Sequence, residues 1–243
     1  METLTFTRKA MSCLLLSLQV DATSSPRTVI QDIWRENHER ELAQGTSMSA
    51  FISTSFPSII EKMIKSDAHP SFSLHDIVSL GSQIEYTHFS ITSIQNWVKR
   101  DFKDFIGHAE EGKKYSLQQV ALFFIIEDLR STLDYDTIRK FCHIVFELIQ
   151  PLDFYSSYAK LFEELDERYR NCIDARSDFV HKWDQMITVA AKEHVAHTTD
   201  LSAEHKETLQ TAIHVALTSV HTSCFQSLSR RYVHGMLFLH NLQ

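Results

Sequence analysis

The chain has 243 residues, 43% hydrophobic and 11% aromatic, which is enough for one large domain or two modest ones. Its formal net charge of −7 argues against non-specific adhesion of the whole molecule to nucleic acid or anionic membrane. The 5 Gly and 4 Pro favour helices over β-turns, and four Cys without a CxxC pair exclude zinc ribbons and fingers and suit free thiols in a reducing compartment.

The first 70 residues contain two helical patterns. Residues 28–43 place apolar side chains on one side and end before Gly45, and residues 57–65 read as a helix that starts at a proline. The apolar run in residues 10–20 is short and interrupted by polar residues, which disfavours a secretory signal. No run approaches the roughly 18 apolar residues of a membrane span. We therefore expect residues 1–70 to be a helical segment that packs on the core of a cytoplasmic protein.

Residues 71–150 are expected to form a second, helical domain. The polar stretch SDAHPSFS precedes it, and Ser116 with Gln119 forms a capping-box signature at the start of one helix. The segment IGHAEEGKKY contains Gly, is polar and is too short for a helix, so it is expected to be a short hairpin. The helical patterns lie at residues 73–80, 91–105, 116–131 and 136–149.

The pattern at residues 91–105, ITSIQNWVKRDFKDF, is segregated by charge. On a helical wheel of about 100° per residue its apolar side chains fall within one arc of about 140°. Asp101 and Asp104 lie on a flank, so we expect them not to neutralise the face opposite the apolar arc. That face, called here the basic strip, consists of Thr92, Asn96, Lys99, Arg100 and Lys103.

Such a strip suits a helix in the major groove of DNA. Asn can pair with adenine, Arg or Lys can donate to guanine, and Thr can reach a base or a phosphate. The order of elements is that of a winged helix-turn-helix: a helix that ends at Gly81, a connection, the helix at 91–105 and then a polar hairpin. In the hairpin, Lys113 and Lys114 would contact phosphates and the Tyr115 hydroxyl would donate to one. The alternative to a DNA-reading helix is an ordinary amphipathic helix whose polar face is solvated.

The stretches NWVKR, GKKYS and IIEDLRSTLDYDTIRK resemble the bacterial domain-of-unknown-function family 1836 (YkrK-type proteins), over about residues 73–150. The resemblance implies a MerR-like winged helix-turn-helix, in which an aromatic residue stands late in the reading helix and a basic residue precedes a wing tyrosine. Trp97 and the pair Lys114–Tyr115 occupy those positions, with Lys114 where Arg is usual. The resemblance also implies a DNA-binding dimer that associates through a C-terminal helix.

Residues 151–243 read as a dimerisation or regulatory domain. Apolar residues from Tyr158 to Ala190 recur at alternating steps of four and three, with Arg176 out of character. A polar break, HTTDLSAEH, separates them from a second apolar stripe between Leu209 and Leu228. These patterns predict a long helical hairpin or, as we prefer because the seam is aromatic, core helices of a bundle.

The chain has 14 His, and several of them in the C-terminal part share helix faces, which would suit a His/Cys metal site in a metal-responsive regulator. Solvated or core-edge histidines are the alternative that we favour, and we assign no metal and no cofactor. The residues involved are His194, His197, His214, His221 and Cys224. Searches for GxGxxG, GK[ST], GxSxG and HExxH motifs find none, so we expect no enzymatic activity.

The sequence therefore predicts an all-α protein with a small β wing, combining a winged helix-turn-helix module with a C-terminal helical hairpin or bundle. Its expected function is sequence-specific binding of double-stranded DNA as a homodimeric regulator of repressor type. The alternative from another class is a helical protein-interaction module that lacks DNA binding. The residues expected to read or grip DNA are Thr92, Gln95, Asn96, Lys99, Arg100, Lys103, Lys113, Lys114 and Tyr115.

Overall fold

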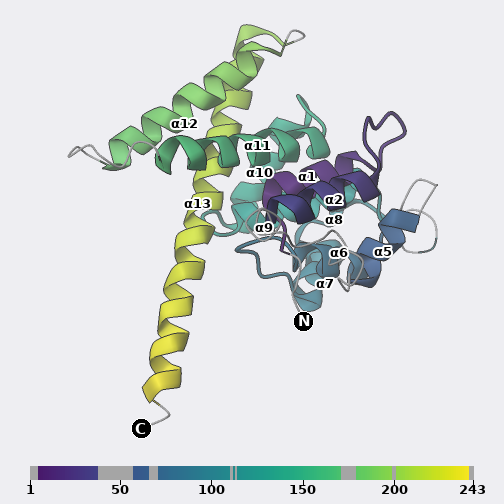
Figure 1. Ribbon diagram of the computed structural model, residues 1–243. Helices are drawn as coiled ribbons and strands as arrows, with labels where there is room; N and C mark the ends of the chain where they lie inside the picture. The colour runs from purple at the N-terminus through teal and green to yellow at the C-terminus, as the bar shows by residue number, and fades with distance from the viewer. Residues whose placement is uncertain are drawn as a thin grey trace. The chain divides into compact units, whose positions relative to one another are not determined.

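The protein is built from α-helices throughout the described part of the chain (Figure 1). The all-α expectation is confirmed. The computed structural model describes residues 5–37, 57–65, 71–109, 112, 114–170, 179–198 and 201–240. Within these ranges there is no β-strand, and two isolated β-bridges join Phe6 to Ile84 and Phe72 to Tyr115. The small β wing is therefore not seen in the described residues.

The chain divides into two compact units. Residues 1–123 with 151–156 form the first, and residues 124–150 with 157–243 form the second. The boundary expected at residue 70 falls inside the first unit, and the one expected at residue 150 coincides with a passage between units. The division into three sequence segments stays a prediction.

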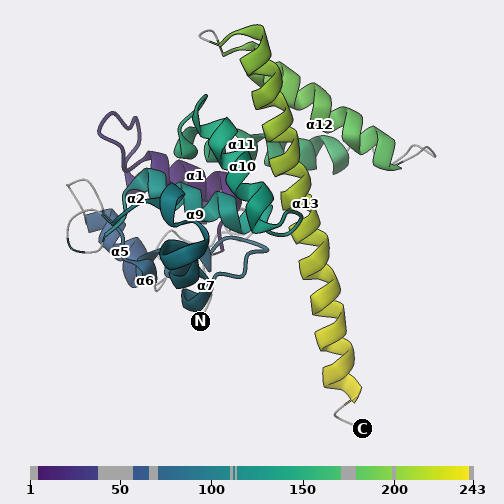
Figure 2. The ribbon, with the colours of Figure 1, turned by 180° about the vertical axis from the view of Figure 1, so that it is seen from behind.

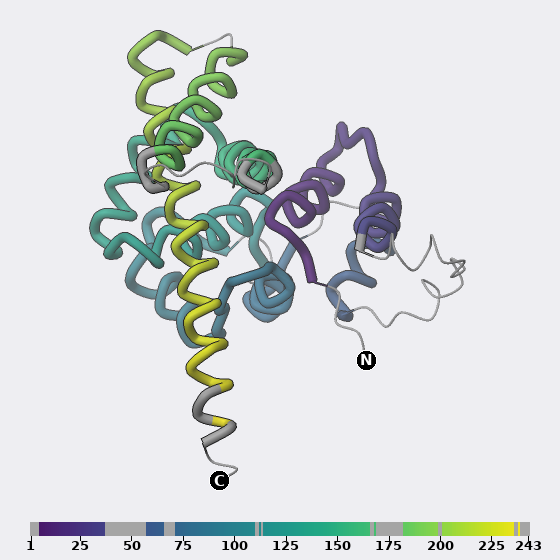
Figure 3. The backbone as a smooth tube through the Cα atoms, turned by 60° about the vertical axis from the view of Figure 1, so that its left-hand side comes forward, coloured from purple at the N-terminus to yellow at the C-terminus, as the bar shows by residue number. Residues whose placement is uncertain are grey.

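The first unit begins with α1 (Arg8–Leu16), α2 (Pro26–Asn37) and α5 (Ser58–Lys65), which pack in sequence against one another (Figure 3). Thr7 caps α1 by accepting from the Ala10 amide at 3.1 Å. The Phe6 amide donates to the Gln83 carbonyl at 2.7 Å, and Arg8 Nη1 donates to the Glu85 carbonyl at 3.1 Å. The start of the chain is thus fastened to the segment that follows α6.

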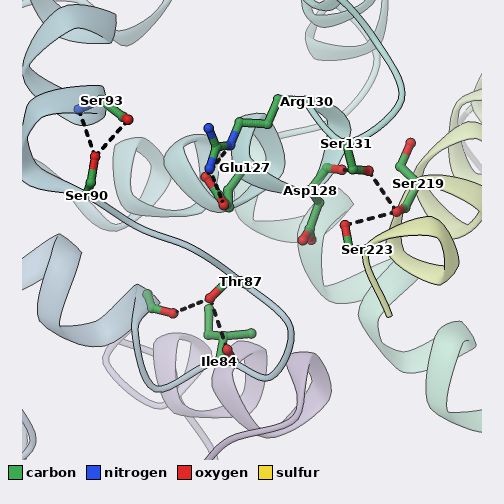
Figure 4. A network of polar contacts seen from close by, with 11 residues as sticks. Ile84, Thr87, Ser90, Ser93, Glu127, Asp128, Arg130, Ser131, Ser219 and Ser223 are labelled. Atoms are coloured by element: carbon green, nitrogen blue, oxygen red, sulfur yellow. Dashed lines mark hydrogen bonds and ion pairs between the residues drawn. The ribbon is translucent and has the colours of Figure 1, made fainter. Parts of the chain in front are cut away.

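The remainder of the first unit carries the candidate site. It contains α6 (Leu74–Gly81), α7 (Ile91–Asn96), a π-helical turn η1 (Trp97–Asp101), α8 (Lys103–Ile106) and the start of α9 (Leu117–Leu129). Ser73 and Asp76 form a capping box at the start of α6. Between α6 and α7, the Thr87 hydroxyl donates to the carbonyls of Gly81 at 2.7 Å and Ile84 at 3.0 Å (Figure 4). These bonds hold the connection between the two helices.

The second unit contains the end of α9, α10 (Tyr135–Phe146), most of α11 (Pro151–Arg170), α12 (Phe179–Ala196) and α13 (Ala203–His240). α12 packs along α13 as a hairpin, and α13 runs on well past it (Figures 1 and 2). Apolar side chains of the predicted second stripe, including Leu209, Ile213 and Leu217, are buried in this hairpin. α12 and α13 thus pair as a hairpin, while the first predicted stripe is divided between α11 and α12 and its residues 171–178 lie outside the described residues.

Polar groups of the second unit are joined by hydrogen bonds around the end of α9 and the turn between α9 and α10. The Ser131 hydroxyl donates to the Ser219 carbonyl of α13 at 2.9 Å, and Thr132 Oγ1 lies 2.5 Å from Ser219 Oγ (Figure 4 shows the Ser131 and Ser219 side). Asp128, 2% exposed, accepts from the Tyr158 hydroxyl at 2.8 Å. These bonds connect the turn to α13 and the end of α9 to α11.

No helix among the described residues combines the length and the apolar character that crossing a bilayer requires.

Candidate nucleic-acid interface

The helix expected at residues 91–105 is interrupted twice. α7 passes at Trp97 into the π-helical turn, in which the Phe102 amide donates to the Trp97 carbonyl at 2.8 Å. Phe102 then leaves helical geometry, with φ −132° and ψ 24°, before the short α8 begins. The prediction of one regular helix over residues 91–105 is therefore wrong in detail, although α7, η1 and α8 are all helical.

A buried aromatic cluster lies beneath the π turn. In a regular α-helix, side chains five residues apart point in different directions, whereas an i→i+5 turn brings them close to one line. Trp97 and Phe102, 0% and 1% exposed, contact each other edge to face at 6.2 Å. Trp97 also stacks on Phe123 of α9 at 6.5 Å. Burying both aromatic rings in one place offsets the cost of the irregular turn.

The opposite side of this segment faces solvent. The side chains of Thr92, Asn96, Lys99 and Lys103 are exposed, as the wheel predicts, while Gln95 is half-buried. Ile94, between them in sequence, is fully buried. These four residues of the basic strip thus lie at the surface of the first unit, and Lys99 and Lys103 form no ion pair with a described carboxylate.

Arg100 departs from the expectation. Its side chain is 75% exposed, but Nε donates to Asp101 Oδ1 at 2.7 Å. The expectation that both flanking acids leave the strip unneutralised is wrong for Asp101. A helical wheel separates adjacent residues by about 100° and therefore does not display this contact. Asp104 is exposed and forms no comparable pair with a described residue.

The predicted wing segment is only partly described, because Lys113, like Glu110 and Glu111, lies outside the described residues. Gly107 and Gly112 have positive φ angles of 70° and 65°, a region that glycine enters at little cost. Lys114 is exposed. Tyr115 is 4% exposed, its ring packs edge to face on Phe123 at 5.6 Å, and burial raises the pKa of its hydroxyl. The structure thus places Tyr115 in the core and not among the solvent-facing residues.

Two contacts that position this region were missed from the sequence. Tyr115 exchanges backbone hydrogen bonds with Phe72, at 2.7 and 2.9 Å, so the segment before α6 pairs with the segment before α9. Gln119 accepts from the Ser116 amide at 2.9 Å, which confirms the capping box, and its Nε2 also donates to the carbonyls of Ile106 at 2.6 Å and His108 at 3.1 Å. The capping box could be predicted from the sequence, whereas the hydrogen bond from Gln119 to Ile106 at the end of α8 could not.

The C-terminal histidines occupy separate environments. His214 Nε2 lies 3.2 Å from Asp184 Oδ1, and the His221 ring lies between those of Phe162 and Trp183, at 4.6 and 4.3 Å. Burial, followed by the charge of Lys160, lowers the pKa of His194. Among the described residues, no three His, Cys, Asp or Glu side chains lie close enough together to hold a metal ion.

The comparisons with known proteins concern the part of the chain that carries the basic strip. Residues 70–165 match the family "Domain of unknown function (DUF1836)". The "Uncharacterized protein YkrK" of Bacillus subtilis (strain 168) is 41% identical over 101 residues, which are 38% of this chain and 43% of that protein. The match thus spans less than half the length of this curated relative, and no solved structure matches the chain. Over residues 70–165, the protein is therefore similar to the DUF1836 family and to its YkrK-type members, as its sequence motifs indicated.

Proposed function

We propose that the protein is a sequence-specific DNA-binding regulator, of repressor type, that reads the major groove with residues 91–105. In this proposal α6, the connection held by Thr87 and the segment from α7 to α8 form a MerR-like helix-turn-helix. Lys114, and Lys113 beside it in sequence, contact the phosphate backbone as the wing would. Tyr115 supports the wing segment from the core and is not proposed as a DNA contact.

The observation that carries the proposal is the separation of side chains across one short segment. Ile94 and Trp97 are fully buried, while Asn96 and Lys99 next to them in sequence are exposed. Trp97 packs on Phe102 and on Phe123 of α9, and this buried cluster anchors the backbone from which the exposed side chains extend. Asn and Lys on a rigid helical surface match the donor and acceptor pattern of base edges in the major groove.

The test is selection of bound fragments from the genome of the source organism, followed by fluorescence anisotropy with the selected site. Asn96→Ala should cost about 1–3 kcal/mol and relax preference at one base pair, whereas Lys99→Ala should weaken binding to all sequences. Lys65→Ala is the matched control, because Lys65 is an exposed lysine of another helix in the same unit, paired with Glu61 at 3.2 Å. Selection of no site, or equal effects of Lys99→Ala and Lys65→Ala, would refute the proposal.

Exposed apolar side chains on the C-terminal half of α13 support the expected homodimer. Phe225 is 56% exposed, Tyr232 73% and Phe238 65%. A two-fold interface can bury such side chains, and DNA-reading proteins of this layout bind paired half-sites as dimers. Light scattering should report a dimer for the wild type and a monomer for Phe225→Ser combined with Tyr232→Ser.

The same exposed side chains also favour the second candidate, a protein-interaction module without DNA binding. Phe225, Leu228 and Tyr232 are all exposed and stand three and four residues apart, on one face of α13, and contiguous exposed apolar side chains mark binding surfaces. Retention of a protein partner by wild-type α13, together with no retention on DNA at low salt, would select this candidate over the first.

A further inference from the structure

The second unit contains a groove that the proposed function does not use. It lies between α10 and α13 and has a volume of about 320 Å³. Val145 and Ala212, which are buried, and Ile144, which is 53% exposed, are among its lining residues. This volume lies at the lower end of the range of about 300–1,000 Å³ that small-molecule pockets occupy.

The wall that α13 contributes is more apolar than its residue types suggest. Thr208 and Thr211 both line the groove. Their hydroxyls donate to backbone carbonyls one turn earlier, Thr208 to Glu204 at 3.1 Å and Thr211 to Glu207 at 3.0 Å. Because these donor hydrogens are committed to the helix, the γ-methyl groups are left to contact an occupant. Together with Phe141 and Ile144 of α10, they form the apolar walls of an open groove.

One end of the groove carries negative charge. Glu204 and Glu207 are exposed, line the groove and stand three residues apart, so they are neighbours on one side of α13. No Lys or Arg is among the described residues that line it. On α10, Lys140 Nζ forms an ion pair with Asp136 Oδ2 at 3.1 Å. The groove thus offers two carboxylates without a cationic side chain in its lining.

From the apolar walls and the paired carboxylates we infer that the groove binds a small amphiphilic amine, an apolar body that carries one protonated amino group. The body would displace water from the walls of α10 and α13, and the ammonium group would lie at Glu204 and Glu207. A ligand of the same shape with a carboxylate would be repelled there. This inference is independent of DNA binding.

Three probes with a common phenylbutyl body test the inference: 4-phenylbutylamine, 4-phenylbutan-1-ol and 4-phenylbutyrate. Calorimetric titration of the full chain should rank the affinities amine first, alcohol second and carboxylate last. Amide shifts in NMR spectra should change at α10 and at the start of α13. The double substitution Glu204→Gln with Glu207→Gln should lower the affinity for the amine by about 3–10-fold, toward that of the alcohol, and should leave the alcohol unchanged.

Filling the groove gives a second test. Thr211→Phe should abolish binding of the amine, while Thr218→Phe, two turns further along α13, should not. Thr218 is a matched control, because it is exposed, does not line the groove and donates its hydroxyl to the His214 carbonyl at 2.9 Å in the same way. Equal affinity for the three probes, or shift changes confined to other helices, would overturn the inference. So would a change of oligomeric state in Thr211→Phe alone, since the groove would then be an interface between copies of the chain.

Discussion

Arg100 and Asp101 are neighbours in sequence and partners in space. Arg100 Nε donates to Asp101 Oδ1 at 2.7 Å, and the carboxylate side chain is only 13% exposed while the guanidinium side chain is 75% exposed. The Asp101 carboxylate therefore neutralises part of the positive charge of the basic strip. Because this carboxylate is mostly buried, solvent and salt screen it incompletely. Within the proposed function, Asp101 moderates the attraction of the strip for phosphate.

Asp101→Asn should consequently strengthen DNA binding. The amide keeps the shape of the side chain and removes its charge, so Arg100 becomes available to one more phosphate. We expect affinity for the selected site to rise about 2–5-fold at low salt and the slope of log K against log salt to steepen by about 1. Anisotropy titrations across a range of NaCl concentrations measure both. Asp104→Asn, on an exposed acid outside this pair, is the control and should change the slope less; equal slopes would contradict the role given to Asp101.

Gly81→Ala should destabilise the first unit. A Cβ at Gly81 would stand 2.4 to 2.6 Å from three ring atoms of Phe89, among them Cγ, so the whole ring would have to move. Overpacking of this kind costs about 1–3 kcal/mol in free energy of unfolding. The control is Gly235→Ala in α13, where a Cβ meets no described atom within 4 Å, and which should raise helix stability by up to about 1 kcal/mol. Urea unfolding followed by circular dichroism compares the two; an unchanged midpoint for Gly81→Ala would show that Phe89 is free to rearrange.

The contribution of Asp76 to stability should depend on pH. Burial alone would raise the pKa of this carboxyl, but hydrogen bonds from the Ser73 amide and hydroxyl and the charge of Lys62 lower it below its ordinary value of 3.8. A lowered folded-state pKa stabilises the protein above pH 3.8, and the contribution disappears as the pH falls through the folded value.

Asp76→Asn should therefore reduce the free energy of unfolding by about 1 kcal/mol at pH 7, and by progressively less below pH 3.8. Unfolding curves at a series of pH values measure the difference. Lys62→Met removes only the weaker, half-exposed partner and should have a smaller effect at every pH. A constant difference between wild type and Asp76→Asn down to pH 2.5 or so would be inconsistent with this assignment.

Cys142 should resist alkylation in the native protein. It is buried in α10, and burial raises the pKa of its thiol to about 12, whereas Cys13 is exposed. Since the thiolate is the reactive form, iodoacetamide at pH 8 should modify Cys142 more slowly than Cys13, by roughly 1,000-fold or more. Peptide mass spectrometry resolves the two sites, and denaturant should bring their rates together. Rapid native labelling of Cys142 would mean that α10 opens locally.

Features set by local sequence were predictable. The capping box of Ser116 and Gln119 opens α9, and the break at residues 197–205 contains the start of α13 at Ala203. Capping and hydrophobic periodicity act over a few residues, so the sequence displays them directly. The exposed residues of the basic strip were predicted for the same reason.

Features set by packing were not predictable. The π turn lies over the contacts of Trp97 with Phe102 and Phe123, and the pairing of Phe72 with Tyr115 joins segments separated by α6, α7, η1 and α8. A tyrosine after two lysines has the composition of a surface loop, although here it belongs to the core. Neither propensity nor a wheel contains this information, because each treats a segment without its neighbours.

The wide turn at Trp97–Asp101 also fixes an angle. An i→i+5 turn holds one residue more than an ordinary α-helical turn, and Phe102 then leaves helical geometry, so Lys103 does not continue the row of Lys99 along one regular helix. A one-residue deletion in this turn should change the direction in which Lys103 leaves the surface relative to Lys99. The placement of Lys103 relative to Lys99 thus depends on the π turn and on the break at Phe102, where Trp97 and Phe102 pack together.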